Sequence, residues 1–124
     1  MTDKSQLGQL GEDLACEYLL DRDYKIIGRN IRQPWGELDI VAKYKDGTLV
    51  FVEVKTMQQY SRSGLQPEDQ LTKAKLRKTQ KTALLYAGHY PKKIDEKRGW
   101  RIDLLAIVLK TDLEPEIKHY ENIG

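Results

Sequence analysis

Hydrophobic residues near the start of the chain recur at helical spacing. Seven positions follow the i, i+3, i+4, i+7 rule: Leu7, Leu10, Gly11, Leu14, Ala15, Tyr18 and Leu19. They predict an amphipathic helix over residues 5–21. A second set with the same period predicts a helix over residues 70–88: Leu76, Thr79, Ala83, Tyr86 and Ala87. Each helix should bury its apolar stripe against another element.

Apolar and β-branched residues also gather in shorter segments that are bounded by turn-forming residues. They predict strands at residues 24–32, 37–44, 48–56, 100–109 and 116–120. Gly28 interrupts the first strand, and the Pro-Trp-Gly segment 34–36 predicts a turn. Asp46-Gly47 is the strongest hairpin signal in the chain. The polar stretches 57–69 and 89–99 are expected to be loops.

The order of these elements is αβββαββ, which indicates the fold class. Residues 49–54 (LVFVEV) are apolar on both faces of a strand, as in a central strand covered on both sides. A hairpin followed by a crossover helix and a further strand implies a mixed sheet. We therefore expect an α/β fold with a mixed central β-sheet flanked by helices. A chain of 124 residues has room for a single domain, residues 1–124.

Several classes of protein are excluded by composition. No apolar run approaches the length of about 18 residues that a membrane span requires, so no membrane partner is expected. The N-terminal segment is charged and lacks the apolar core of a secretory signal, which favours the cytoplasm. Cys16 is the single cysteine, and the chain has two histidines, so a disulfide framework and a structural zinc site are not expected.

The net charge of +2 conceals a strong segregation of charge along the chain. Residues 24–111 carry eighteen basic and nine acidic side chains, whereas residues 1–23 and 112–124 are both acidic overall. A basic middle section can face a polyanion without making the whole molecule strongly cationic. A solvated, lysine-rich surface explains the same pattern, so charge alone favours a nucleic-acid partner only slightly.

The predicted hairpin carries the residues with chemical potential. Glu53 and Lys55 point to one face of their strand, because side chains in a strand alternate. On the partner strand, Asp39 should take the face opposite to that of Leu38, Ile40 and Ala42. A tight turn at Asp46-Gly47 can then set Asp39 beside Glu53 and Lys55. The sequence therefore predicts two carboxylates and one ammonium group on neighbouring strands.

Two carboxylates this close need a cation or a proton. At 4 Å they repel by about 4 kcal/mol at an effective dielectric constant near 20. Oxygen ligands without histidine or thiolate suit Mg²⁺, or Mn²⁺, which retains several waters. Such an ion polarises a phosphate and lowers the pKa of water, while Lys55 could orient that water or stabilise developing charge. A surface ion pair between Glu53 and Lys55 is the alternative, although charges inside an apolar strand are costly unless they are paired or functional.

Glu12 is a further candidate at the edge of the first apolar stripe. It lies one helical turn from Gly8 and from Cys16, whose small size leaves it room to reach the sheet. An ordinary exposed helical glutamate explains it equally well. Gly8 and Gly11 each disfavour a helix by about 1 kcal/mol, and close packing would account for them.

The second helix carries five basic residues within nine positions: Lys73, Lys75, Arg77, Lys78 and Lys81. On a helical wheel, Lys73 and Lys75 flank the apolar stripe, so they could extend toward a phosphate bound at the sheet. The other three lie further out and could contact a nucleic-acid backbone at longer range. Solvated lysines are an equally good explanation. No base-reading element is present, so binding should depend on shape or backbone.

Residues 36–56 (GELDIVAKYKDGTLVFVEVKT) resemble the signature of the YraN-like family of small bacterial proteins, which belongs to the restriction-endonuclease-like superfamily. The resemblance extends along most of the chain. It includes a G-x-x-G-E-x-x-A motif at residues 8–15, N-x-R at Asn30 and Arg32, a lysine at Lys75, and R-x-D at Arg101 and Asp103. Met57, Gln70 and Lys73 depart from the family's pattern, which bears on substrate contacts rather than on the metal centre.

The resemblance implies a restriction-endonuclease-like three-layer fold and an Mg²⁺-dependent endonuclease that acts on DNA, including branched DNA, in repair or recombination. Asp39, Glu53 and Lys55 would be the metal-binding and catalytic residues, with Glu12 as an accessory carboxylate from the helix. A similar layout in archaeal Holliday-junction resolvases, which are dimeric, implies a homodimer. A non-catalytic nucleic-acid-binding or adaptor module on the same fold is the alternative, and RNA is a third possible substrate.

Overall fold

The computed structural model describes residues 4–59 and 64–124. Its helices and strands are α1 (Lys4–Leu20), β1 (Tyr24–Gln33), β2 (Gly36–Tyr44), β3 (Leu49–Gln58), α2 (Lys73–His89), β4 (Trp100–Leu109) and β5 (Glu116–Tyr120), with short 3₁₀ helices η1 (Pro67–Gln70) and η2 (Pro91–Lys93). The predicted order αβββαββ is confirmed. Residues 60–63 of the predicted loop lie outside the described residues.

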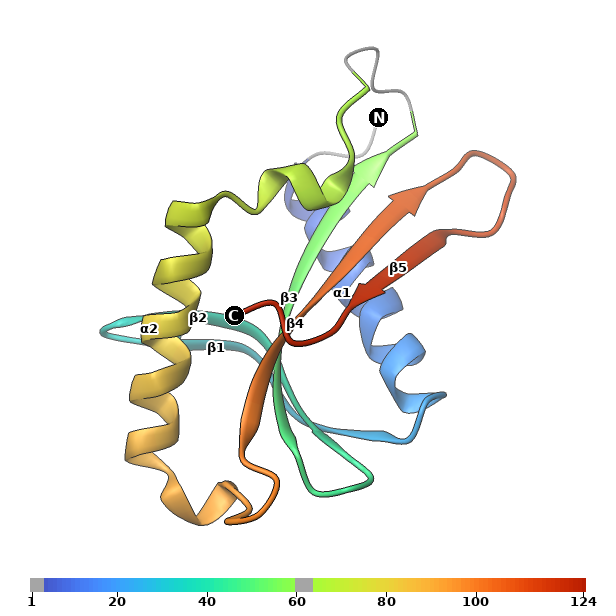
Figure 1. Ribbon diagram of the computed structural model, residues 1–124. Coiled ribbons are helices and arrows are strands. Elements are labelled where there is room, and N and C mark those ends of the chain that lie inside the picture. Colours follow the sequence, from blue (N-terminus) through green and yellow to red (C-terminus); the bar gives the residue numbers. More distant parts are fainter. Residues whose placement is uncertain (1–3, 60–63) are drawn as a thin grey trace.

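The five strands form one mixed sheet in the order β1-β2-β3-β4-β5. Only the central pair, β3 and β4, runs parallel, and the other neighbours are antiparallel. The connection from β3 to β4 contains α2, which returns the chain to the end of the sheet where β3 began. This is the crossover that the sequence predicted, and it makes β3 and β4 parallel. Figure 1 shows α1 and α2 well separated, with the strongly twisted sheet between them.

Each face of the sheet is covered by one helix. Ala15, Cys16 and Leu19 of α1 pack on one face, in a core that includes Val50 and Val52 of β3. Ala83 and Tyr86 of α2 pack on the other face, against Leu49 and Phe51 of the same strand. The sequence pattern of β3, which is apolar on both sides, is thereby explained. The result is an α/β fold in three layers, with helix, sheet and helix.

The hairpin between β2 and β3 forms as predicted. Gly47 has a φ of 99°, in the region that glycine adopts most easily, and its N–H donates to the carbonyl oxygen of Tyr44 at 2.9 Å. Gly28 also marks an irregularity, because the β1–β2 register shifts between Ile26 and Gly28.

Three details of the predicted elements are wrong. Leu38 packs with the α2-side core, whereas Ile40 and Ala42 belong to the α1-side core, so the three do not share a face. Residues 67–70 form η1 rather than loop and helix, and α2 begins only at Lys73, where the Thr72 hydroxyl accepts from the Lys75 N–H at 3.2 Å.

Within the described residues, no helix has the length and apolarity needed to span a membrane.

Candidate active site

The pairing of β2 with β3 brings Asp39 and Glu53 to neighbouring positions. Their regular register ends at Ile40 opposite Val52, one residue before Asp39 and Glu53 would face each other. Beyond that point a side chain accepts the hydrogen bond of a β3 backbone amide, since the Val54 N–H donates to Asp39 Oδ2 at 2.9 Å. Asp39 is thereby fixed against the backbone of β3. The predicted convergence of the two carboxylates is present.

Glu53 is buried, with 8% of its surface exposed. The Thr79 hydroxyl of α2 donates to Glu53 Oε1 at 3.2 Å, and Lys55 Nζ lies 3.8 Å from Oε2. Burial, followed by the charge of Asp39, raises the pKa of Glu53 to about 7, against the opposing effects of Lys55 and Thr79. The pair is therefore not an ordinary surface ion pair, and Glu53 holds a proton more tightly than an exposed glutamate does.

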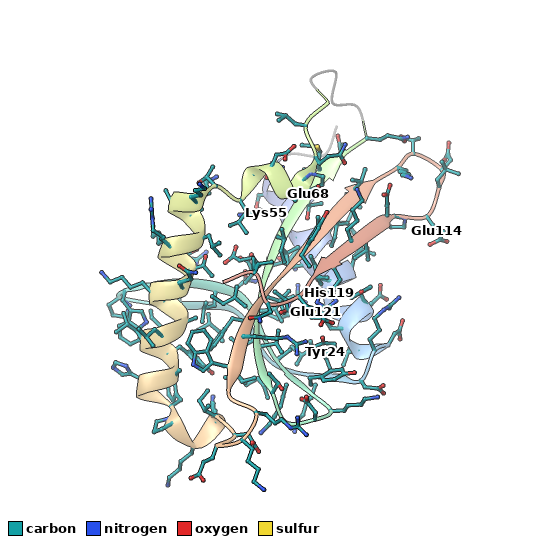
Figure 2. All side chains as sticks on the ribbon, viewed as in Figure 1. Tyr24, Lys55, Glu68, Glu114, His119 and Glu121 are labelled. Carbon is teal, nitrogen blue, oxygen red and sulfur yellow. The ribbon has the colours of Figure 1, made fainter. Side chains whose placement is uncertain are left out.

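These residues form the floor of a cleft with a volume of about 590 Å³, which we call the first cleft. One wall is the joined end of β1 and β2, residues 32–37, and the other is the N-terminal half of α2. The cleft opens because β1 and β2 remain paired to their ends, Gln33 with Gly36, after β2 has left β3. Figure 1 shows this end reaching past α2, and Figure 2 places Lys55 between β3 and the start of α2.

The end of the β1–β2 hairpin is held against α2 by two contacts. Trp35 stacks on His89, with ring centroids 4.4 Å apart. Gly36, with a φ of 153°, lies so close to Thr82 that a Cβ there would overlap the threonine hydroxyl. Glycine at this position therefore lets the hairpin approach the helix closely enough to form the wall of the first cleft.

The walls of the first cleft carry three basic residues and one acidic residue, Glu37, whose Oε1 lies 3.6 Å from Arg32 Nε. Arg32 lies on the hairpin side, and Lys75 and Lys78 lie on α2. One face of α2 lines the cleft, and its residues follow helical spacing: Lys75, Lys78, Thr79 and Thr82. Because Thr79 contacts Glu53, this face is turned toward the cleft, and the lysines on it are Lys75 and Lys78. Lys75 lines the cleft, whereas Lys73, the other lysine expected beside the apolar stripe, does not, and Lys78 lines it as well. Three basic residues of α2 are exposed and line neither of the clefts described here: Lys73, Arg77 and Lys81.

Glu12 approaches the same site from α1. With the Asn30 amide oriented so that its nitrogen faces Glu12, it donates to the two carboxylate oxygens at 2.9 and 3.1 Å. Burial and then the charge of Asp39 raise the pKa of Glu12. Close packing explains Gly11, because a Cβ there would overlap Thr56 of β3. Glu12 is thus a partly buried, oriented side chain rather than a freely solvated one.

The donor set allows a metal ion with few protein ligands. Among the described residues, no three His, Cys, Asp or Glu side chains lie close enough together to hold a metal ion. Asp39 and Glu53 offer two adjacent carboxylates, and Mg²⁺ commonly binds through one or two carboxylates and retains several waters. Residues that pattern alone did not assign to the site are Thr79, Arg32, Asn30 and Trp35. Arg32 and Asn30 stood out only through the family motif.

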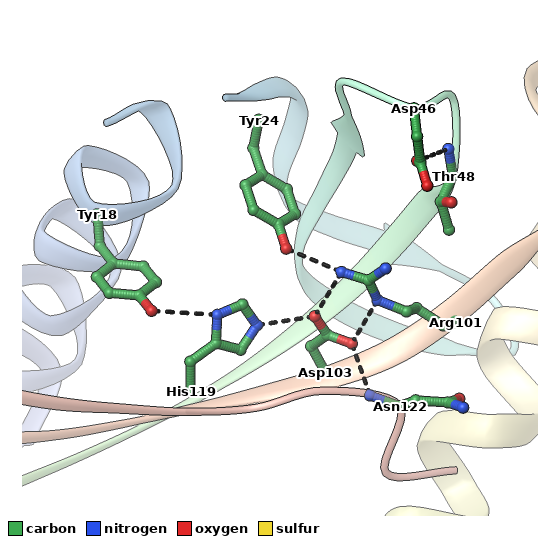
Figure 3. Close-up of polar contacts among 8 residues, drawn as sticks. All are labelled: Tyr18, Tyr24, Asp46, Thr48, Arg101, Asp103, His119 and Asn122. Carbon is green, nitrogen blue, oxygen red and sulfur yellow. Dashed lines mark hydrogen bonds and ion pairs between the residues drawn. The ribbon is translucent and has the colours of Figure 1, made fainter. Parts of the chain in front are cut away.

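Arg101 and Asp103 form a separate, structural cluster (Figure 3). Asp103 is fully buried and accepts from Arg101 Nε at 3.0 Å, from the Asn122 N–H at 2.9 Å and from His119 Nε2 at 2.8 Å. Arg101 also donates to the Tyr24 hydroxyl at 2.8 Å. None of these residues lines the first cleft. The R-x-D motif therefore ties the C-terminal segment to the sheet.

Comparison with known proteins places this chain in a family. Residues 11–107 match the model of a family described as "Uncharacterised protein family UPF0102". The chain belongs to the UPF0102 family. This confirms the resemblance to YraN-like proteins. The UPF0102 match includes Glu12, Asp39, Glu53 and Lys55, and it ends within β4.

Individual UPF0102 relatives cover nearly the whole chain. A UPF0102 protein of Fervidobacterium nodosum is 37% identical over 116 residues, covering 94% of this chain and 80% of the relative. Another from Trichlorobacter lovleyi is 38% identical over 116 residues, covering 94% and 87%. A third from Syntrophotalea carbinolica is 40% identical over 114 residues, covering 92% and 87%.

Proposed function

We propose that this protein is a metal-dependent nuclease that hydrolyses phosphodiester bonds in DNA. The observation that carries the proposal is the buried Glu53 carboxylate beside Asp39 and Lys55, on the floor of a cleft with basic walls. Carboxylates attract a hard divalent cation, and the surrounding lysines and arginine attract phosphate. A site for nucleic-acid hydrolysis needs both kinds of group within a few ångströms.

Asp39 and Glu53 would hold the ion, Mg²⁺ or Mn²⁺. When bound, it supplies positive charge that polarises the phosphate and lowers the pKa of an attacking water. Lys55 Nζ orients the water or stabilises charge that develops on the phosphate oxygens. Thr79 fixes the rotamer of Glu53, and the Val54 N–H fixes Asp39. Glu12 assists through a water, and Lys75 and Lys78 bind the DNA backbone, with Lys73, Arg77 and Lys81 acting at longer range.

The wider assignment follows from the same residues. The three-layer arrangement, with its E-x-K pair on the central strand, supports a restriction-endonuclease-like single domain. We propose that the protein acts in the cytoplasm. Its substrate there would be DNA, and the process it serves would be DNA repair or recombination. A homodimer would present two such sites, one for each strand of a duplex.

The proposal is tested with purified protein on linear, branched and single-stranded DNA and on RNA, with Mg²⁺, with Mn²⁺ and with EDTA. We expect metal-dependent cleavage that falls by about 100-fold or more in Asp39→Asn and in Lys55→Ala, since each removes charge from the reacting centre. Lys92→Ala, which changes an exposed lysine outside both clefts and outside α2, is the control and should lose less than about threefold.

The second candidate is a nucleic-acid-binding module without turnover. It is favoured by the lack of a third acidic ligand near Asp39 and Glu53 among the described residues. Such a module would bind DNA with wild-type affinity in Asp39→Asn, because the basic walls remain, and would show no cleavage under any metal condition. Cleavage that survives in both Asp39→Asn and Lys55→Ala would place the reaction elsewhere and refute the assignment.

A further inference from the structure

A second cleft meets the first at the candidate active site. Its volume is about 470 Å³, and it lies between the N-terminal half of α1 and the end of β3. Asp39 and Lys55 line both clefts, so the candidate site lies where the two join. This volume is within the range of about 300–1,000 Å³ typical of small-molecule sites. A nucleic-acid strand bound across Asp39 and Lys55 would therefore continue from one cleft into the other.

Gly8 on the wall of the second cleft has no explanation in the fold. It is exposed and lies inside α1, where glycine is unfavourable relative to alanine. A Cβ at Gly8 would meet nothing within 4 Å, in contrast to Gly11, where packing against Thr56 leaves no room. The expectation that close packing explains both glycines is thus wrong for Gly8. Gly8 lines the second cleft, at a position where its surroundings leave room for a side chain.

The two clefts differ in the chemistry of their walls. The first carries Arg32, Lys75 and Lys78 in addition to the shared Lys55, and Glu37 is paired with Arg32. The second adds no basic residue to Lys55; its further lining residues are Leu7, Gly8, Glu12, Val54, Thr56, Met57, Gln58 and Gln70. Cationic walls suit phosphates, whereas neutral hydrogen-bonding groups and apolar surface suit a sugar and a base. Apart from Glu12 and the shared Asp39 and Lys55, the lining of the second cleft is uncharged, and this part of it is matched to the sugar and base of a nucleotide rather than to a phosphate.

We infer that the second cleft binds the nucleotide on the far side of the reacting phosphate, and that Gly8 is kept small to admit it. This inference rests on the proposed function. Thr56, Gln58 and Gln70 would contact the sugar or the base edge, and Glu12, held by Asn30, would accept from a donor of the same nucleotide. The backbone of the bound strand would pass α1 at Gly8, where any side chain would take up space in the cleft.

The test fills the second cleft without disturbing the fold. Gly8→Leu and Gly8→Ala are compared with Gly88→Leu and Gly88→Ala, since Gly88 is also an exposed helical glycine whose Cβ would meet nothing, and it lines neither cleft. Affinity for a fluorescent DNA duplex is measured by anisotropy with Ca²⁺ in place of Mg²⁺, and stability by thermal unfolding. We expect Gly8→Leu to bind at least about tenfold more weakly while its unfolding temperature stays level or rises by about 4 °C. The Gly88 variants should bind as the wild type does.

A second measurement does not depend on Gly8. Met57→Cys, in the second cleft, should crosslink to DNA that carries a mixed disulfide with a small thiol on the nucleotide next to the mapped cleavage position; the Cys thiolate attacks this disulfide, and the small thiol leaves. Leu84→Cys, on an exposed part of α2 outside both clefts, should not. Wild-type binding by Gly8→Leu, together with no crosslink at Met57→Cys, overturns the inference even if the protein cleaves DNA. Wild-type protein that neither binds nor cleaves nucleic acid overturns the inference and the proposed function together.

Discussion

Glu53 is a residue whose charge conflicts with its surroundings. Its pKa is raised from 4.5 to about 7, first by burial and then by the charge of Asp39. Between these two values the unfolded chain has lost the proton while the folded protein still holds it. Since the folded state then binds more protons, stability falls as pH rises through this interval. The contribution is fully present below about pH 4.5 and is lost above about pH 7.

Glu53→Gln should therefore stabilise the metal-free protein at high pH. The interval between the two pKa values corresponds to about 3 kcal/mol, so the variant should exceed the wild type by up to that amount at pH 8 and by little near pH 4.5. Thermal unfolding in EDTA from pH 4.5 to 8 measures the difference. Glu96→Gln, at an exposed position outside both clefts, is the control. A constant difference across this range would contradict the raised pKa.

At the scale of elements, periodicity predicted what depends on local sequence. The stripe of α1, the Asp46-Gly47 turn and the alternation of β3 were sufficient to bring Asp39, Glu53 and Lys55 together. What they could not give depends on contacts between distant segments. Leu38 joins the α2-side core beyond the point where β2 leaves β3, and α2 presents Lys78 rather than Lys73 because Thr79 meets Glu53. Asn30, whose φ is 48°, is positioned by the irregular strand β1.

The close approach of the β1–β2 hairpin to α2 predicts the effect of Gly36→Ala. A Cβ there would overlap the Thr82 hydroxyl, and a φ of 153° is unfavourable for alanine. We expect a loss of about 1–3 kcal/mol in urea unfolding, together with weaker DNA binding as the cleft wall shifts. Thr82→Ala in the same chain removes the overlapping atom, so the double variant should recover part of the loss. Purely additive effects would show that the overlap is not the cause.

At the scale of the whole molecule, the cluster around Asp103 joins segments that are far apart in sequence. Arg101 links it to Tyr24 at the start of β1, while His119 of β5 connects it to the Tyr18 hydroxyl of α1 at 3.2 Å. The Asn122 N–H adds the C-terminal segment. Asp103 lies on the α1 side of β4, next to the core formed with α1, and away from the cleft that holds Glu53. Among the described residues, the two buried carboxylates are thus separated: Asp103 is paired with Arg101 and His119, whereas Glu53 lies in the first cleft.

This separation predicts opposite pH behaviour for Asp103. Burial opposes ionisation, but the hydrogen bonds from His119, Asn122 and Arg101 outweigh it and lower the pKa of Asp103. Its stabilising contribution is therefore present above about pH 4, the ordinary value for the unfolded chain, and is lost as pH falls through the lowered pKa. Asp103→Asn should cost about 3 kcal/mol at pH 7, because charged hydrogen bonds are replaced by neutral ones, and the difference should shrink in acid.

Urea unfolding from pH 7 to pH 3 follows this difference, with Asp112→Asn, at an exposed turn, as the control. Well below its unfolding midpoint, folded Asp103→Asn should retain the DNA affinity of the wild type, since the cluster lines neither cleft. A stability difference that grows in acid would mean that burial outweighs the three partners. Loss of DNA affinity in a fully folded variant would mean that the C-terminal segment affects the clefts. The segment contacts the α2 side of the sheet, since the Ile123 N–H donates to the Ile102 carbonyl oxygen at 2.8 Å and the Ile123 side chain packs against the α2-side core. The two measurements therefore separate a purely stabilising cluster from one that also shapes the binding surface.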